Sequence, residues 1–264
     1  MPTDVRCLVE TDHPIPVLRL VGDLDLDSAD TVRGALLDAL QAAPGALVVD
    51  VTGLTVAVPA ARSVLTDVLR GAGDWAATRV VLCDPTGRWS EPGTGLVVHP
   101  DAGTALTALG DGPVGRRLSA ELEPVVGAAR RARELVTEAC ARWDLPGLVG
   151  PGCIVVTEMV NNVVAHVRGA MTVRLARRPG GLAVTVRDGS TRLPRFGGPV
   201  PPTSYGGRGL LLIDSVSRRW GSVPLDDGKI VWALLDAEDD DAVSATPAGI
   251  GQRTALDQPT APGR

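Results

Sequence analysis

Along the first third of the chain, short runs of β-branched residues alternate with segments in which apolar residues recur at helical spacing. Three runs are expected to be strands: 15–22, 46–52 and 78–83. Apolar residues then recur at helical spacing from about Ser28 and again over 60–69. Asp27 or Ser28 is expected to supply the N-cap oxygen of the first helix. This alternation predicts a layered α/β domain over residues 1–110.

A Gly- and Pro-rich stretch at 84–100 and a short helical pattern at 101–109 end this part of the chain. Residues 111–123 are interpreted as a linker, because they contain turn residues and no clear period. A second domain is expected at 124–236, and it begins with a long helix at 124–143.

Residues 154–167 read IVVTEMVNNVVAHV, and their many valines would favour a strand. Apolar doublets recur every four residues, however, and Glu158, Asn162 and His166 form an i, i+4, i+8 stripe. The segment is therefore predicted to be a helix with one polar face. A face that meets only water is the ordinary explanation for such a stripe.

A β-hairpin is predicted next, from strands at 171–177 and 182–188. An irregular stretch at 189–206 is long enough to be a lid or binding loop. It leads to a helix that opens on glycines, where free backbone amides favour anions such as phosphates. These glycines are Gly206, Gly207 and Gly209.

The charge is unevenly distributed: the net charge is −7 over residues 1–110 and +5 over residues 111–236. A basic second half suits nucleic acid, a phosphorylated small molecule or an acidic protein. Aromatic residues are too few for a single-stranded nucleic-acid surface. Residues 237–264 contain few large apolar residues and are expected to be disordered.

The four cysteines show no C-x-x-C pair, so they are expected to be reduced and mostly buried thiols. No window approaches the ~18 to 20 apolar residues of a membrane span, and no secretory signal is recognised, so a cytoplasmic protein is expected. The P-loop motif is absent, and Lys229 is the only lysine.

Four segments, TEMVNNVVAH, VRDGS, SYGGRGLLLIDSVSRRWG and GKIVWALL, together resemble the histidine-kinase-like ATPase fold in its anti-sigma-factor serine/threonine kinase branch, over about residues 118–236. The resemblance implies an α/β sandwich with helices on a mixed sheet, and it implies ATP and Mg²⁺ as cofactors. By the same resemblance, Glu158 is the general base and Asn162 holds Mg²⁺. Asp188 would bind the adenine amino group, and the turn at Gly207, Arg208 and Gly209 would bind the phosphates.

The match has departures, because the family pattern D-x-G-x-G reads here Asp188, Gly189, Ser190, Thr191, Arg192. Both later glycines are replaced, so the geometry of the adenine loop is not fixed by the resemblance.

The first half, with LVGDLDLDSADTVRGALLDAL followed by LVVDVTGLT, resembles the STAS domain of anti-sigma-factor antagonists over about residues 7–110. The phosphorylated D-S-S-G turn of that family reads Val58-Pro59-Ala60-Ala61 here, and Ser63 is the next hydroxyl. This half is expected to dock a partner or to pack against the ATP-binding half.

These features predict an ATP-dependent serine/threonine kinase of the partner-switching type that phosphorylates an antagonist protein in trans. The alternative is a non-catalytic, nucleotide-binding interaction module. A sensor histidine kinase is disfavoured, because His13 and His99 lie in loop-like contexts. The expected partners are a sigma factor, a STAS-type antagonist or both, with neither nucleic acid nor membrane; a homodimer stays open. Arg130, Arg131 and Arg133 form a candidate docking surface, although solvated arginines are the commoner case.

Overall fold

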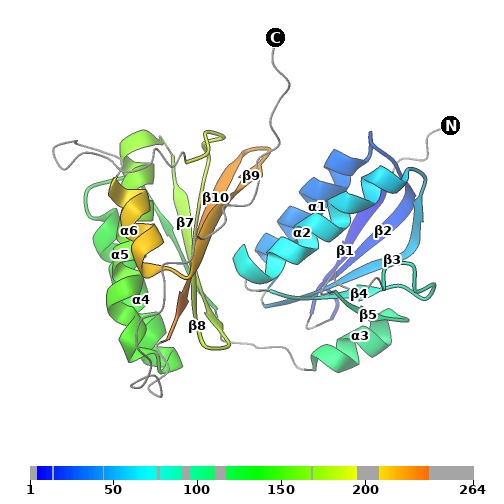
Figure 1. Ribbon diagram of the computed structural model, residues 1–264, viewed down its shortest axis with the longest axis horizontal. Helices are drawn as coiled ribbons and strands as arrows, with labels where there is room; N and C mark the ends of the chain where they lie inside the picture. Colours follow the sequence, from blue (N-terminus) through cyan, green and yellow to red (C-terminus); the bar gives the residue numbers. More distant parts are fainter. Residues whose placement is uncertain are drawn as a thin grey trace, which may run out of the picture.

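The structure is a computed structural model of the 264-residue chain, shown in Figure 1. At 72–75 and 208 only the backbone is described. Of the predicted tail at 237–264, residues 238–264 lie outside the described residues. The described ranges are 5–13, 15–43, 45–75, 78–90, 96–110, 117–167, 169–194 and 208–237.

The first half is built on a five-stranded sheet with the order β1-β2-β3-β4-β5. Its β1–β2 pair is antiparallel and its other pairs are parallel. The three predicted strands are present as β2, β3 and β4, and β1 and β5 are additional edge strands. The strands are β1 (Arg6–Glu10), β2 (Val17–Leu24), β3 (Ala46–Val56), β4 (Arg79–Cys83) and β5 (Val97–His99).

Helices cover both faces of this sheet, as the parallel connections require. Helices α1 and α2 lie on one face, and α3 packs on the other against β3, β4 and β5. The α/β character predicted for this half is confirmed, and α2 runs six residues further than expected. The helices are α1 (Ala29–Ala42), the 3-10 turn η1 (Pro59–Ala61), α2 (Arg62–Trp75) and α3 (Ala102–Leu109).

The predicted side-chain cap of α1 is wrong. Ser28 is the N-cap residue, but its hydroxyl makes no capping bond to the helix. It instead accepts a hydrogen bond from the backbone N–H of Asp25, and the carboxylate of Asp25 accepts the N–H of Ser28 at 2.8 Å. The backbone N–H and the hydroxyl of Ser28 both donate to the Asp25 carboxylate, and these two bonds hold the pKa of Asp25 below its usual value. The Ser28 side chain therefore stabilises the turn before the helix rather than the helix end.

The second half is a five-stranded sheet with the order β6-β7-β8-β10-β9. Every pair is antiparallel, whereas the family resemblance implied a mixed sheet. Strand β6 falls within the stretch interpreted as a linker at 111–123, so this interpretation is corrected: the second sheet already begins at Arg117. The strands are β6 (Arg117–Leu122), β7 (Met171–Arg178), β8 (Gly181–Asp188), β9 (Arg219–Leu225) and β10 (Gly228–Asp236).

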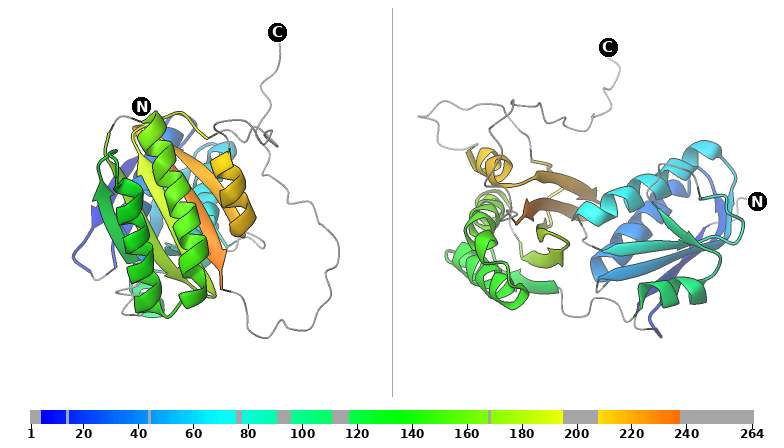
Figure 2. Two further views of the ribbon diagram at one scale, coloured as in Figure 1. Left: turned by 90° about the vertical axis from the view of Figure 1, so that its left-hand side faces the viewer. Right: turned by 60° about the horizontal axis from the view of Figure 1, so that its bottom comes forward.

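Three helices cover one face of this sheet, and the left view of Figure 2 shows them side by side. The valine-rich segment is helical, as its four-residue period predicts, because its apolar residues pack against α4 and the sheet. The helices are α4 (Ala128–Trp143), the 3-10 turn η2 (Pro146–Leu148), α5 (Val149–His166) and α6 (Arg208–Val216).

Residues 146–166, which comprise η2 and α5, are long and apolar enough to cross a membrane, with a mean hydropathy of 1.5. This finding corrects the expectation that no window is suitable. In the fold, Val155, Val156 and Val160 of this segment are fully buried in the core of the second half. Core helices of soluble proteins commonly meet the same criterion, so the finding is weak evidence for a membrane.

Helices α1 and α2 lie between the two sheets and cover the second sheet on the face opposite α4 and α5 (Figure 1). Ile230 of β10 is only 3% exposed, and it belongs to the apolar core of the first half. The two halves therefore share a layer of helices, and the chain is built of five alternating layers.

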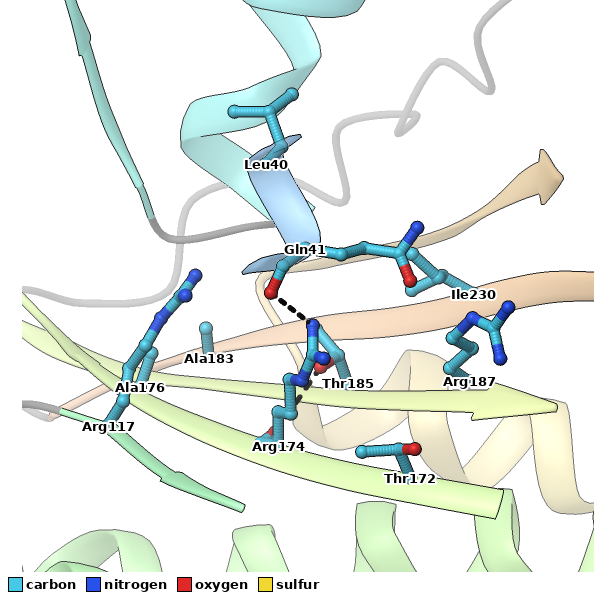
Figure 3. Close-up of a pocket in the computed structure, with 10 residues that line it drawn as sticks. All are labelled: Leu40, Gln41, Arg117, Thr172, Arg174, Ala176, Ala183, Thr185, Arg187 and Ile230. Atoms are coloured by element: carbon cyan, nitrogen blue, oxygen red, sulfur yellow. Dashed lines mark hydrogen bonds between the residues drawn. The ribbon is translucent and has the colours of Figure 1, made fainter. Parts of the chain in front are cut away.

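Two arginines of the second sheet bind the carboxyl end of α1, which has no basic residue in its own last turn. Arg174 of β7 donates to the carbonyl of Gln41 at 2.7 Å (Figure 3). Arg117 of β6 donates to the carbonyl of Ala43. Arg117 also donates to the hydroxyl of Thr78 at 2.8 Å. Cations stabilise the negative end of a helix dipole, so these bonds join the two halves.

Burial, followed by the neighbouring Arg174, lowers the pKa of Arg117 to about 10. Burial also lowers the pKa of Arg174. Between these arginines and Ile230 there is room for about one water molecule, in a cavity of about 20 Å³. The interface is therefore closely packed.

All four cysteines are free thiols, as predicted. Cys83 and Cys140 are buried, whereas Cys7 and Cys153 are partly buried.

Candidate functional site

A cavity of about 760 Å³ opens between α5, α6 and the ends of β8 and β10. Its size is in the range of small-molecule and cofactor sites. Helix α5 and the sheet contribute both apolar and polar side chains to the lining, and further polar groups come from the segment that follows β8. The lining residues include Met159, Asn162, Val163, His166, Val186, Asp188, Ser190, Arg192, Gly209, Leu210, Lys229 and Val231.

The polar stripe of α5 faces this cavity over its last two turns. Asn162 and His166 are exposed and both line the cavity, as their i, i+4 spacing on one helical face requires. Glu158, one turn earlier, is half-buried and does not itself line the cavity. The stripe therefore meets a cavity rather than open solvent alone.

Glu158 reaches the cavity wall at the start of α6. A Cβ atom placed on Gly209 would lie 2.7 Å from Oε2 of Glu158 and 3.6 Å from its Cβ. The glutamate side chain thus lies directly against the backbone of Gly209, which lines the cavity. A carboxylate here is close enough to act on a group that enters the cavity near α6.

Asp188 is at the end of β8 and is 1% exposed. Its Oδ1 atom accepts a hydrogen bond from the ammonium of Lys229 at 2.8 Å and from the backbone N–H of Ser190 at 2.8 Å. Lys229 is 7% exposed, and it also donates to the carbonyl of Ser190 at 3.1 Å. The buried carboxylate is therefore paired and hydrogen-bonded, as buried charges must be.

The register of the sheet places these two charges together. Lys229 pairs with Asp188 across the β10–β8 ladder, so their side chains lie on the same face. Val231 and Val186 form the next pair on that face, and both also line the cavity. The floor of the cavity is therefore one charged pair beside one apolar pair.

The predicted phosphate turn is only partly described. Helix α6 begins at Arg208, and Gly209 is in its first turn and lines the cavity. Gly207 lies outside the described residues, and at Arg208 only the backbone is described. The amino end of α6 therefore lies at the cavity through Gly209, and the backbone amides of a helix start favour an anion.

The structure thus brings Asn162, Asp188 and Gly209 to one cavity, with Glu158 against its wall. Sequence reasoning missed Lys229 as a site residue. The available signal was that the only lysine of the chain stands at the start of the last apolar run, GKIVWALL. The register of this strand against VRDGS does not follow from the sequence pattern.

The donor groups fit a nucleotide with Mg²⁺. The described residues contain no cluster of three or more His, Cys, Asp or Glu side chains that could hold a metal alone. Mg²⁺ usually keeps several waters and takes one or two protein oxygens together with phosphate oxygens. The exposed amide of Asn162 at the cavity could provide such an oxygen.

Comparison with known protein families matches residues 120–233 to the histidine kinase-like ATPase domain. No curated protein matches the chain. This match supports an ATP-binding, kinase-like function for the second half, and the matched range includes Glu158, Asn162, Asp188 and Gly209. The STAS-type identity of the first half and the anti-sigma branch stay predictions.

Proposed function

We propose that the protein is an ATP-dependent serine/threonine protein kinase of the partner-switching type, which phosphorylates an antagonist protein in trans. The observation that carries the proposal is the cavity in which Asn162, Asp188 and Gly209 meet, with the Glu158 carboxylate against Gly209. Groups along one cavity thus provide an adenine-binding end, a phosphate-binding end and a general base.

In this proposal the Asp188 end of the cavity binds the adenine, and the amino end of α6 binds the phosphates. Asn162 contributes the protein oxygen for Mg²⁺, which neutralises charge on the phosphates when it is bound. Gly209 allows the chain to approach the ligand closely, because no side chain projects from it.

Glu158 acts as the general base. The serine hydroxyl of the antagonist attacks the γ-phosphorus of ATP, and its proton passes to the Glu158 carboxylate. The bond from the γ-phosphorus to the bridging oxygen of ADP breaks, so the products are ADP and a phosphoserine. A half-buried carboxylate beside the helix amino end is suitably placed for this transfer.

The second candidate is a nucleotide-binding interaction module without phosphotransfer. The motif that carries the acceptor serine in antagonists reads Val58-Pro59-Ala60-Ala61, so it has no hydroxyl. Ser63 is exposed, but its hydroxyl donates to the carbonyl of Ala60 at 3.0 Å within the start of α2. The acceptor hydroxyl missing from this motif favours a docking role for the first half. In the kinase proposal the acceptor serine belongs to another chain.

One experiment separates the two candidates. The purified protein is incubated with radiolabelled ATP and a panel of serine-bearing antagonist domains, alongside Glu158→Gln and the control Glu138→Gln. Glu138 is an exposed carboxylate on α4, away from the cavity. We expect transfer by the wild type and the control, and loss of transfer by at least a hundredfold in Glu158→Gln with ATP binding retained. Tight ATP binding without transfer to any domain would favour the interaction module.

A further inference from the structure

We infer that Lys229 recognises the nucleobase together with Asp188: its ammonium donates a hydrogen bond to N1 of adenine, while Oδ2 of Asp188 accepts one from the exocyclic amino group. The inference rests on the proposed binding of ATP in this cavity. It assigns a specificity-determining role to a residue that otherwise would be only the structural partner of Asp188.

The hydrogen-bond inventory of the pair supports this role. A lysine ammonium has three donors, and Lys229 uses two of them on described residues, for Asp188 Oδ1 and the Ser190 carbonyl. Both bonds that Asp188 accepts within the described part of the chain fall on Oδ1. One N–H of Lys229 and the Oδ2 atom of Asp188 are thus available to a ligand, side by side at the cavity floor.

The strand geometry orients both groups to the cavity. Asp188 and Lys229 are paired across adjacent strands, so their side chains lie on the same face of the sheet. Val186 and Val231, the next pair, offer an apolar surface beside them on which a flat ring can lie. A purine on these valines would present its polar edge to the charged pair.

A neighbouring acceptor and donor match adenine. Enzymes read an isolated base by hydrogen bonds to its Watson–Crick edge, and adenine presents there an amino donor beside the N1 acceptor. Guanine presents the reverse order at the same two positions, a carbonyl oxygen beside an N–H. In the same pose, guanine would place oxygen against the carboxylate and N–H against the ammonium. The pair therefore selects adenine over guanine.

An ion pair could also be purely structural, and base analogues distinguish the two roles. The affinity of the wild-type protein is measured for ATP, for 1-deaza-ATP, which has a C–H group in place of N1, and for GTP. A hydrogen bond to a charged group contributes about 1.5–3 kcal/mol, so we expect 1-deaza-ATP to bind about tenfold or more weakly than ATP. GTP is expected to bind more weakly still.

The variant Lys229→Met should reduce the difference between ATP and 1-deaza-ATP to less than about twofold, because the donor is gone. The control Arg177→Met, an exposed cation at the far end of β7, should retain the tenfold difference. The wild-type comparison needs no variant, so it holds even if Lys229→Met fails to fold. Equal wild-type affinities for ATP and 1-deaza-ATP, or for ATP and GTP, would overturn this inference alone. Absence of binding of every nucleotide would overturn the proposed function, and this inference with it.

Discussion

The Oε2 atom of Glu158 lies 2.7 Å from the point at which a Cβ atom of residue 209 would stand. Helices α5 and α6 approach each other closely here, and only glycine at 209 leaves the carboxylate where it is. Gly209 also lines the cavity. One small residue therefore allows the carboxylate of the proposed general base to lie against the start of α6.

Replacement of Gly209 by alanine should displace Glu158. Because the atom that the new methyl group meets is at the end of a flexible side chain, the glutamate can rotate away and the fold should be retained. We expect the transfer rate to fall at least tenfold while the melting temperature changes by less than about 3 °C. The control is Gly147→Ala in η2, where an added Cβ meets nothing within 4 Å. An unchanged transfer rate would show that the position of Glu158 is unimportant.

Asp188→Asn should weaken ATP binding about ten- to a hundredfold, because a neutral amide replaces the charged acceptor and leaves Lys229 without its counterion. Isothermal titration calorimetry measures this directly. Asp144→Asn is the matched control: Asp144 is exposed and has φ = 56°, a conformation that asparagine also adopts readily. Equal affinity in wild type and Asp188→Asn would remove Asp188 from the base site.

Arg174→Met should loosen the contact between the two halves. The substitution removes the bond from the guanidinium to the Gln41 carbonyl and leaves the carboxyl end of α1 without one of its cations. We expect a loss of about 1–3 kcal/mol in the free energy of unfolding, measured by urea denaturation. Arg177→Met, on the same strand but exposed, should change it by less than about 0.5 kcal/mol. Similar losses in both variants would contradict the interface role of Arg174.

Cys83 should resist alkylation in the folded protein. Burial, with smaller contributions from the Asp50 and Asp101 carboxylates, raises the pKa of its thiol to about 12, and the thiolate is the reactive form. Treatment with iodoacetamide at pH 8 followed by mass spectrometry should modify Cys83 only after urea is added. Cys7, which is half-buried, is the internal comparison. Modification of Cys83 at the rate of Cys7 without urea would contradict its burial.

Periodicity predicted the helices well, even where residue type pointed elsewhere. The valine-rich α5 is the clearest case, because its doublets repeat every four residues and the core lies on one side. The short edge strands were missed for a physical reason. Strand β9 contains Gly221 and Pro224, and edge strands tolerate residues that would disrupt a central strand.

The site was predictable as far as it depended on local patterns. Asn162 and His166 are one turn apart on a helix, so their common face follows from the sequence. The ion pair between Asp188 and Lys229 joins residues 41 positions apart, and it depends on the register of two strands that no short pattern reveals. The docking of Arg174 on α1 spans 133 positions, so it likewise required the fold.

Lys229 and Ile230 are consecutive residues of β10, and their side chains point to opposite faces of the sheet. One enters the cavity, and the other is anchored in the hydrophobic interior of the first half. A movement of the first half away from the second would therefore displace β10, the strand that carries Lys229. If a partner protein bound α1 and α2 in place of the second sheet, it would weaken nucleotide binding. By thermodynamic linkage, bound nucleotide would then weaken the affinity for that partner by the same factor.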